Sequence, residues 1–425
     1  MAQAPRALRE AAWFLAGLAL ALTVAAVAVV LVTRTERGRE EVLAFTLERL
    51  GAGVHGKLDV ARLDGDLFTG AKLYGVALRG EDGEPFVLAD SAFLNYDLRT
   101  LVTPRILIEE LVLYDPEVYV TQLPGDTLWN YQKIFARDPN AAPGPERITI
   151  LDRVRVVNGH LKAQYPFVPD ERLSPREQQV EIREALADTS PLLVRRVPGG
   201  LLRTVEASGL NGVISQVRFA PGTEKGTYAN VERLSGTVKF YRTPFRLREV
   251  RGEVAVLQKH VELRAPRLVM NTSPLSAAGT IRFGERRGDS PWYDITFRSD
   301  SVALGDLRWL WPRFPREARG SLSLVVETRS PEEVMILARD MRLQAPGTRL
   351  TGDFGMIFGG DTLRFVDVEL RADPLRVALI EEMLPGGMPV RGLRIGSAEL
   401  RGASERPREV RRGAAARAQR TEAAD

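Results

Sequence analysis

The chain has 425 residues, of which 44% are hydrophobic and 27% are charged, and its formal net charge is +4. This balance is ordinary for a folded protein and argues against wholesale disorder. Most basic residues are Arg and alternate with Asp and Glu, so no dense basic stripe is expected and nucleic-acid binding is disfavoured. The chain contains no Cys, which excludes disulfides, thiolate metal sites and thiol nucleophiles.

Residues 11–32 contain no charged side chain and are long enough to cross a hydrocarbon core of about 30 Å as a helix. We therefore predict a cytoplasmic tip and transmembrane anchor in 1–33, with the N-terminus inside because of the arginines before the run. A cleaved signal peptide is the alternative, since Ala26-Val27-Ala28 has small residues at the right spacing, but the apolar run continues past that point. The residues expected to anchor the helix are Trp13, Phe14, Leu18, Leu22 and Val30.

A short amphipathic helix is predicted at 34–52, and beyond it the sequence favours β-strands. Apolar and polar residues alternate in short runs that Gly, Pro, Asp or Asn interrupt about every 8 to 12 residues. The fold class expected is mainly β: an N-terminal transmembrane helix, then an elongated, curved antiparallel β-sheet of groove-like units with short helices. Strands are predicted at 73–78, 86–94, 106–113, 148–157, 161–165, 237–241, 252–256, 261–269, 294–297, 321–326 and 363–370.

Composition changes divide the region after the anchor. A linker at 136–147, rich in Pro, Ala, Asn and Asp, is expected to separate a first β unit at 53–135 from repeated β units at 148–395. Within the second region, 169–198 reads as a helical insertion, because Ser174 and Glu177 have capping-box spacing and Pro175 takes the first helical position. The tail at 396–425 has few large apolar residues and is predicted to be disordered.

An internal repeat appears when the chain is shifted by 73 residues. The shift places Gly279 on Gly352 and Pro312 on Pro385, and it matches the segment DITFRSD at 294–300 with DVELRAD at 367–373. Each copy then leads into a short apolar helix before its Pro. Chance similarity between alternating strands is the alternative, but the joint match favours stacked units that bury a continuous apolar face.

No motif for catalysis, a cofactor or a metal is present. His55, His160 and His260 are scattered, without zinc-ligand spacing, and no nucleophile elbow, phosphate-binding loop or dinucleotide fingerprint occurs. We therefore expect a non-enzyme with no cofactor and no metal site. The concentrated aromatic group is formed by Trp309, Trp311 and Phe314, for which core packing is favoured over a lipid-facing or partner-facing plug.

The stretch 51–120 resembles the N-terminal region of the AsmA and TamB-like family, the translocation and assembly module proteins of the Gram-negative envelope. The resemblance is carried by LDGDLFTGAKLYGVALRGEDGEPFVLADSAFLNYD and LVTPRILIEELVLYDPEVYV, and the segments 263–312 and 336–385 look like later β units of that family. It implies a single-pass inner-membrane protein with its bulk in the periplasm. Family members are usually longer and meet a BamA-type outer-membrane partner, so this chain looks shortened at its C-terminus.

A one-sided sheet that repeats along an axis must have its apolar face covered. If the sheet curls into a groove, that face can hold acyl chains, each methylene being worth about 0.8 kcal/mol. The leading hypothesis is a non-enzymatic groove for phospholipid, or another acyl-chain ligand, in outer-membrane biogenesis. The alternative is an assembly factor for outer-membrane or autotransporter proteins that acts by strand addition. The candidate groove-lining residues are Val238, Phe240, Ile295, Phe297, Leu322, Leu324, Val368 and Leu370.

Overall fold

The computed structural model describes a large part of the chain after the predicted anchor. The described residues are 56–66, 70–96, 105–126, 128–134, 148–169, 173–188, 190, 192–219, 227–257, 260–282, 292–309, 313–330, 333–359, 362–376, 394–395, 397–404 and 415–419. Within these ranges no helix has the length and apolar character needed to cross a bilayer. The anchor predicted at 11–32, with Trp13, Phe14, Leu18, Leu22 and Val30, lies outside them, as do the helix at 34–52 and the linker at 136–147.

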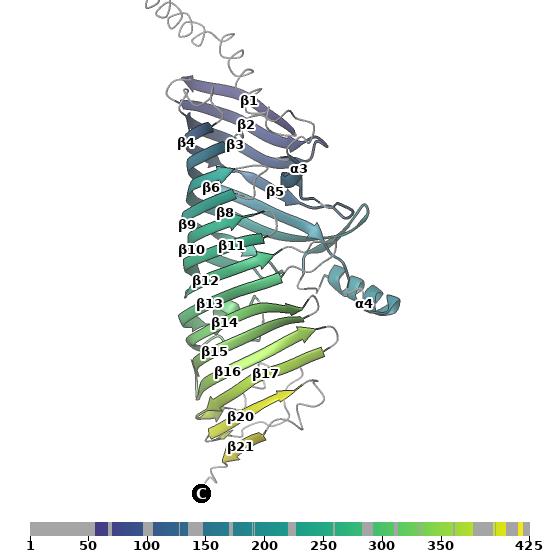
Figure 1. Ribbon diagram of the computed structural model, residues 1–425, viewed down its shortest axis with the longest axis vertical. Helices are drawn as coiled ribbons and strands as arrows, with labels where there is room; N and C mark the ends of the chain where they lie inside the picture. The colour runs from purple at the N-terminus through teal and green to yellow at the C-terminus, as the bar shows by residue number, and fades with distance from the viewer. Residues whose placement is uncertain are drawn as a thin grey trace, which may run out of the picture.

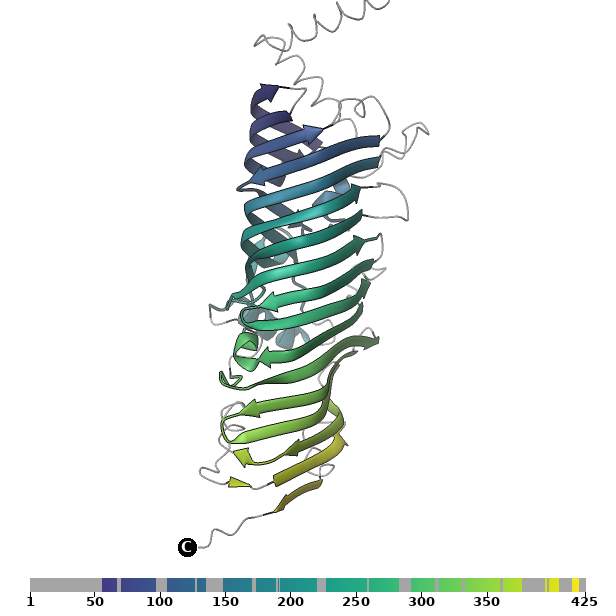
Figure 2. The ribbon, with the colours of Figure 1, turned by 90° about the vertical axis from the view of Figure 1, so that its left-hand side faces the viewer.

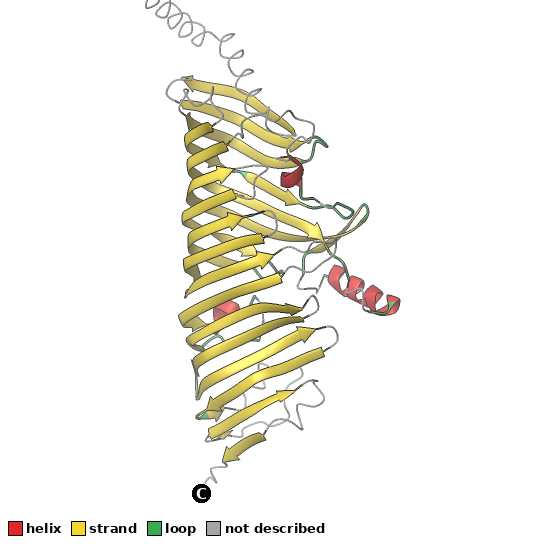
Figure 3. Ribbon diagram, viewed as in Figure 1, coloured by secondary structure: helices red, strands yellow, loops and turns green. Residues whose placement is uncertain are grey.

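The described chain is mainly β, as the sequence predicts, with few helices (Figures 1 and 3). The strands of the N-terminal half are β1 (Gly56–Asp66), β2 (Gly70–Gly80), β3 (Pro85–Tyr96), β4 (Arg105–Tyr114), β5 (Glu117–Thr121), β6 (Ile148–Pro166), β7 (Val194–Val197), β8 (Gly200–Phe219), β9 (Thr227–Lys239) and β10 (Phe245–Val256). They are followed by β11 (His260–Met270), β12 (Ser273–Arg282), β13 (Trp292–Ala303), β14 (Arg319–Ser330), β15 (Glu333–Ala345), β16 (Thr348–Gly359), β17 (Thr362–Ala372), β18 (Leu375–Arg376), β19 (Arg394–Ile395), β20 (Ser397–Ser404) and β21 (Ala415–Gln419). The helices are α3 (Asn130–Ile134), α4 (Pro175–Leu186) and the 3-10 turn η2 (Leu304–Leu307).

One long, mixed sheet runs the length of the molecule, and most of its strands pair antiparallel. From β8 to β17 each strand pairs with the next one in the chain, and β17 continues to β20 and β21. Near the N-terminal end, β4 and β5 both pair parallel with β6. Figure 2 shows the strands stacked obliquely along the long axis, so the molecule grows by adding strands and not by enclosing one core.

Bulges recur near the middle of successive strands. A β-bulge adds one residue to one strand of a pair, bends that strand and increases its twist. At one of them the left-handed backbone of Asp340 (φ 51) is held by a 2.8 Å hydrogen bond from its N–H to the Asp353 carboxylate. The registers shift between Arg251 and Glu253, Ala265 and Leu268, Ser299 and Val302, Ala338 and Met341, and Asp353 and Gly355. These bends let the sheet curve across its strands.

The two glycines that the 73-residue shift aligns serve the same structural purpose. Gly279 of β12 and Gly352 of β16 have φ values of +156° and +126°. A Cβ at Gly279 would lie 2.0 Å from the carbonyl oxygen of Asp294, and one at Gly352 would lie 1.8 Å from that of Glu369. In both places the neighbouring strand approaches too closely for any side chain, so glycine is required.

The helical insertion predicted at 169–198 contains α4. Ser174 is its N-cap, Pro175 is in the first turn, and the predicted capping box with Glu177 is present. The Glu177 carboxylate accepts a 2.8 Å bond from the Ser174 backbone N–H, while the Ser174 hydroxyl accepts a 3.4 Å bond from the Glu177 N–H. Both unpaired donors at the helix start are thereby satisfied.

The structure departs from the sequence-based expectations in three places. The range 169–198, predicted to be a helical insertion, also contains the strand β7. The strands predicted at 148–157 and 161–165 form one continuous strand, β6, because Gly159 lies within it and pairs with Leu210 of β8 instead of ending it. In 396–425, where disorder is predicted, the structure places β20 and β21. Ala398 and Leu400 of β20 continue the apolar alternation and pair with Ala372 and Leu370 of β17.

Replacing Gly352 by Ala should lower the free energy of unfolding by about 1–3 kcal/mol, because the new Cβ meets the Glu369 carbonyl. Urea unfolding of the full chain, followed by circular dichroism, measures the change. Gly83→Ala is the matched control, since Gly83 also has positive φ (+81°) but no atom within 4 Å of an added Cβ. Equal losses in the two variants would show that backbone strain, not strand approach, requires Gly352.

Hydrogen bonds from the Ser174 hydroxyl and backbone N–H hold the pKa of Glu177 below its ordinary value. A pKa depressed by folding means that this stabilisation is complete above the ordinary carboxyl pKa and is lost as pH falls through the folded-state pKa. Ser174→Ala should therefore raise the Glu177 pKa, as measured by carboxyl NMR titration with Glu177→Gln to assign the signal. Gln179→Ala, an exposed change in α4, should leave that pKa in place; a Glu177 pKa unchanged by Ser174→Ala contradicts the capping box.

Candidate functional site: the apolar face of the sheet

A continuous row of apolar residues crosses the middle of the sheet. Residues paired directly opposite in neighbouring strands project to the same side, so the strand registers define each row. One row runs from β9 to β17 and contains Ala229, Val254, Leu263, Gly279, Ile295, Val326, Ile336, Met356 and Phe365. We call this row the apolar stripe, and the side of the sheet that bears it the apolar face.

Most side chains of the apolar stripe are only partly covered. Ile295 is 8% exposed and counts as buried, but Val254, Leu263, Val326, Ile336, Met356 and Phe365 are all of intermediate exposure. The flanking rows of the same face are also apolar, as in Val256, Val261 and Ile281 or in Phe297, Leu324 and Phe354. The face therefore keeps apolar surface available along its length.

The predicted lining residues gather on this face. Val238, Ile295, Phe297, Leu322, Leu324, Val368 and Leu370 all belong to it by register. Phe240 follows the end of β9 and joins an aromatic cluster described below. Successive side chains of a strand point to opposite sides of the sheet, so residues two positions apart, such as Ile295 and Phe297, lie on the same face.

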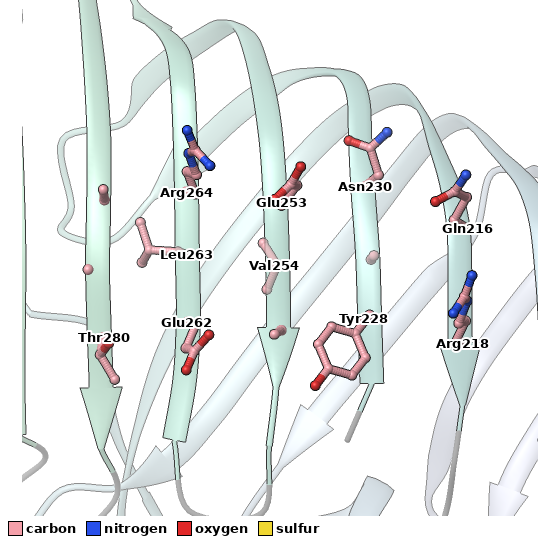
Figure 4. Close-up of a pocket in the computed structure, with 14 residues that line it drawn as sticks. Gln216, Arg218, Tyr228, Asn230, Glu253, Val254, Glu262, Leu263, Arg264 and Thr280 are labelled. Atoms are coloured by element: carbon pink, nitrogen blue, oxygen red, sulfur yellow. The ribbon is translucent and has the colours of Figure 1, made fainter. Parts of the chain in front are cut away.

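The opposite face is polar over β8 to β12 and apolar farther along. A shallow, open depression of about 740 Å³ lies there, and Figure 4 shows polar side chains on adjacent strands around it, with Glu253 directly opposite Arg264. Farther toward the C-terminus this face carries a buried cluster of Met335, Leu337 and Ile357, at 2–6% exposure. Only in its middle part, therefore, does the sheet have one apolar face and one polar face.

The sheet bends toward its apolar face. Tyr165 of β6 and Tyr293 of β13 both belong to this face, yet β8, β9, β10, β11 and β12 lie between them in the sheet. A flat sheet would separate the two strands by roughly 29 Å at about 4.8 Å per step. Burial raises the pKa of Tyr293, and the charges of Tyr165 and Arg203 also act on that pKa, which requires the three side chains to lie much closer than this. The apolar face is therefore concave here.

An aromatic cluster surrounds Arg203 of β8 on the concave side. The guanidinium carbon lies 4.8 Å from the centre of the Phe240 ring, 5.6 Å from Tyr241 and 5.8 Å from Tyr165. Trp309, which follows η2, stacks on Phe245 of β10 with ring centres 4.6 Å apart and also contacts Phe240 and Tyr241. At these distances the aromatic rings attract the guanidinium by cation–π interaction.

Burial raises the pKa of the Tyr165 and Tyr293 hydroxyls above the ordinary tyrosine value. Both phenols are therefore neutral at physiological pH and supply no negative charge to Arg203. Arg203 also takes no part in the ion pairs recorded between described residues. The guanidinium is a positive charge in a largely apolar setting.

The described residues hold no group of three or more His, Asp or Glu side chains able to bind a metal ion. Nε2 of His260 lies 3.1 Å from Oε1 of Glu262, and His55 lies outside the described residues. Trp309 packs against Phe240 and Tyr241, which follow β9, and against Phe245 of β10. Trp311 lies outside the described residues.

Sequence reasoning missed Arg203 and the residues around it. Arg203, Tyr165 and Phe245 come from β8, β6 and β10, and no local pattern joins them. One signal was available: Arg203 takes a position of the apolar alternation that Val205 and Ala207 continue in β8. A charged side chain in an apolar row is energetically unfavourable unless it has a polar or charged partner.

Comparison of the chain with models of known protein families, with curated proteins and with solved structures gives no match.

Proposed function

We propose that this chain is a non-enzymatic envelope protein whose apolar face forms a groove for phospholipid in outer-membrane biogenesis. The observation that carries the proposal is the apolar stripe, which crosses nine strands without a charged side chain while most of its members stay partly exposed. Exposed apolar surface of this extent is characteristic of a binding surface. An acyl chain is the ligand that matches it without requiring polar partners.

The energetics favour such a ligand. Each methylene removed from water is worth about 0.8 kcal/mol, so a two-chain lipid alone in water is disfavoured by tens of kcal/mol. The apolar stripe extends about 38 Å, taking eight strand steps of about 4.8 Å. A lipid moving along it exchanges one set of Val, Leu, Ile and Phe contacts for another, so its tails stay out of water and no catalytic group is needed.

The location of the protein is part of the same proposal. The apolar run at 11–32 would anchor it in the inner membrane by a single pass, with the sheet in the periplasm. The resemblance to AsmA and TamB-like proteins supports this placement and makes a BamA-type outer-membrane protein a candidate partner. The stacked strands would then extend the groove away from the anchor.

The second candidate is an assembly factor that holds client strands. Strand addition requires an unpaired edge, and β1 pairs only with β2 among the described strands. In that case the edge of the sheet would bind the ligand and the apolar face would be secondary. Extended peptides, not lipid, would accompany the purified protein.

Introducing a charge into the apolar stripe should remove bound lipid. The double variant Leu263→Glu with Ile336→Glu places two carboxylates in the path of the acyl chains, and burying each against hydrocarbon costs several kcal/mol. Phospholipid extracted from the full chain, purified in mild detergent and quantified by mass spectrometry, should fall about tenfold or more.

Ala278→Glu is the matched control, because Ala278 is exposed on the opposite face beside Gly279. It should retain the wild-type lipid content. Wild-type protein free of lipid, or equal lipid content in the control and the double variant, would refute the groove. Peptide in place of lipid would favour the assembly factor.

A further inference from the structure

Three buried N–H donors in the aromatic cluster have no acceptor among the described residues. They are Nε and Nη2 of Arg203 and Nε1 of Trp309, each shielded from solvent. A buried donor left unpaired is unfavourable, and one on a charged group is more so. Both side chains lie near the rings of Phe240 and Tyr241, so their unpaired donors point to one polar ligand that binds there.

The two free nitrogens of Arg203 form one edge of its guanidinium. Nε–H and Nη2–H point in the same direction and are spaced to meet two oxygens of one phosphate or carboxylate. The ring of Phe240, 4.8 Å from the guanidinium carbon, attracts the positive charge but supplies no hydrogen-bond acceptor to Nε–H and Nη2–H. The aromatic contacts therefore position this edge, which we call the fork, but leave its two N–H groups without hydrogen-bond acceptors.

The position of Arg203 relates this fork to the apolar stripe. Arg203 lies on the apolar face by register, and its charge is close enough to Tyr293 to oppose the rise of that residue's pKa. Ile295 of the apolar stripe follows Tyr293 on the same side of β13. A ligand with an anionic group at Arg203 would have the apolar stripe within reach of its tails. Amphiphiles with an anionic head and acyl chains have this arrangement.

We propose that Arg203 and Trp309 form a headgroup site, in which Nε and Nη2 of Arg203 bind two oxygens of a lipid phosphate and Trp309 Nε1 donates to a third acceptor. The inference rests on the proposed groove and adds to it a fixed anchoring point and a preference for anionic phospholipid. The neutral tyrosines leave the single positive charge of Arg203 to balance one phosphate.

The test measures binding of a six-carbon-chain phosphatidylglycerol, below its micelle concentration, to the full chain in mild detergent by calorimetry. Inorganic phosphate and the corresponding diacylglycerol are titrated in parallel to separate the head from the tails. Arg203→Leu should weaken phosphatidylglycerol binding about tenfold or more, because it removes a bidentate, charge-assisted contact. Arg203→Lys should recover only part of the loss, since an ammonium lacks the fork.

Two further variants guard against a purely structural effect. Trp309→Phe keeps the ring but removes Nε1–H, and should weaken binding less than Arg203→Leu. Arg264→Leu removes an exposed Arg on the opposite face and should leave binding unchanged. Without ligand, Arg203→Leu should unfold at the same temperature as the wild type or higher, because it removes an unpaired buried charge.

The outcomes distinguish this site from the groove itself. Phosphatidylglycerol that binds the wild type and Arg203→Leu equally would overturn the headgroup site and leave the groove standing. Binding of inorganic phosphate through Arg203, with no lipid bound by the wild type, would overturn both the groove and the lipid headgroup. A lower unfolding temperature for Arg203→Leu with unchanged lipid affinity would assign Arg203 to packing.

Discussion

The structure depends on keeping every strand paired while one side of the sheet stays apolar from β9 to β17. Backbone N–H and C=O groups require partners wherever they are buried, and a continuous sheet provides them at each strand without a central core. The cost is an apolar surface that grows with each strand added. Ordinary sheets cover such a surface with helices or a second sheet. Here the described helices are α3, α4 and η2, which are short.

Curvature of the sheet reduces the exposure of that apolar surface. The recurrent bulges bend individual strands, and Gly279 and Gly352 let neighbouring backbones approach where the chain needs positive φ. A bent sheet brings its own distant parts together, as Tyr165 and Tyr293 demonstrate. Bending partly shelters the apolar side chains, while their intermediate exposure leaves surface for a ligand. The fold and the proposed binding surface therefore depend on the same features, the bulges and glycines that set the curvature.

The sequence predicted what depends on local patterns. Alternation identified strands such as β13 and β14 and put Ile295, Phe297 and Leu324 on one face, while capping-box spacing located the start of α4. It failed where the deciding contact is distant in the chain. Gly159 reads as a break but is tolerated inside β6 because β8 pairs with it. The cluster around Arg203 depends on the bend of the sheet, which no period-two pattern encodes.

A uniform apolar stripe gives an acyl chain no reason to stop at any one strand, because each step exchanges similar contacts at similar free energy. A single fixed charge removes that equivalence. Arg203 lies where the concave face brings β8 and β13 together, and its unsatisfied fork gives one register along the stripe a polar interaction that the others lack. The aromatic rings surround the Arg203 guanidinium, and none of the ion pairs between described residues involves it, so an anionic head would gain most at the proposed site. If the proposed groove and headgroup site both hold, the protein would bind many acyl tails and select among lipid heads.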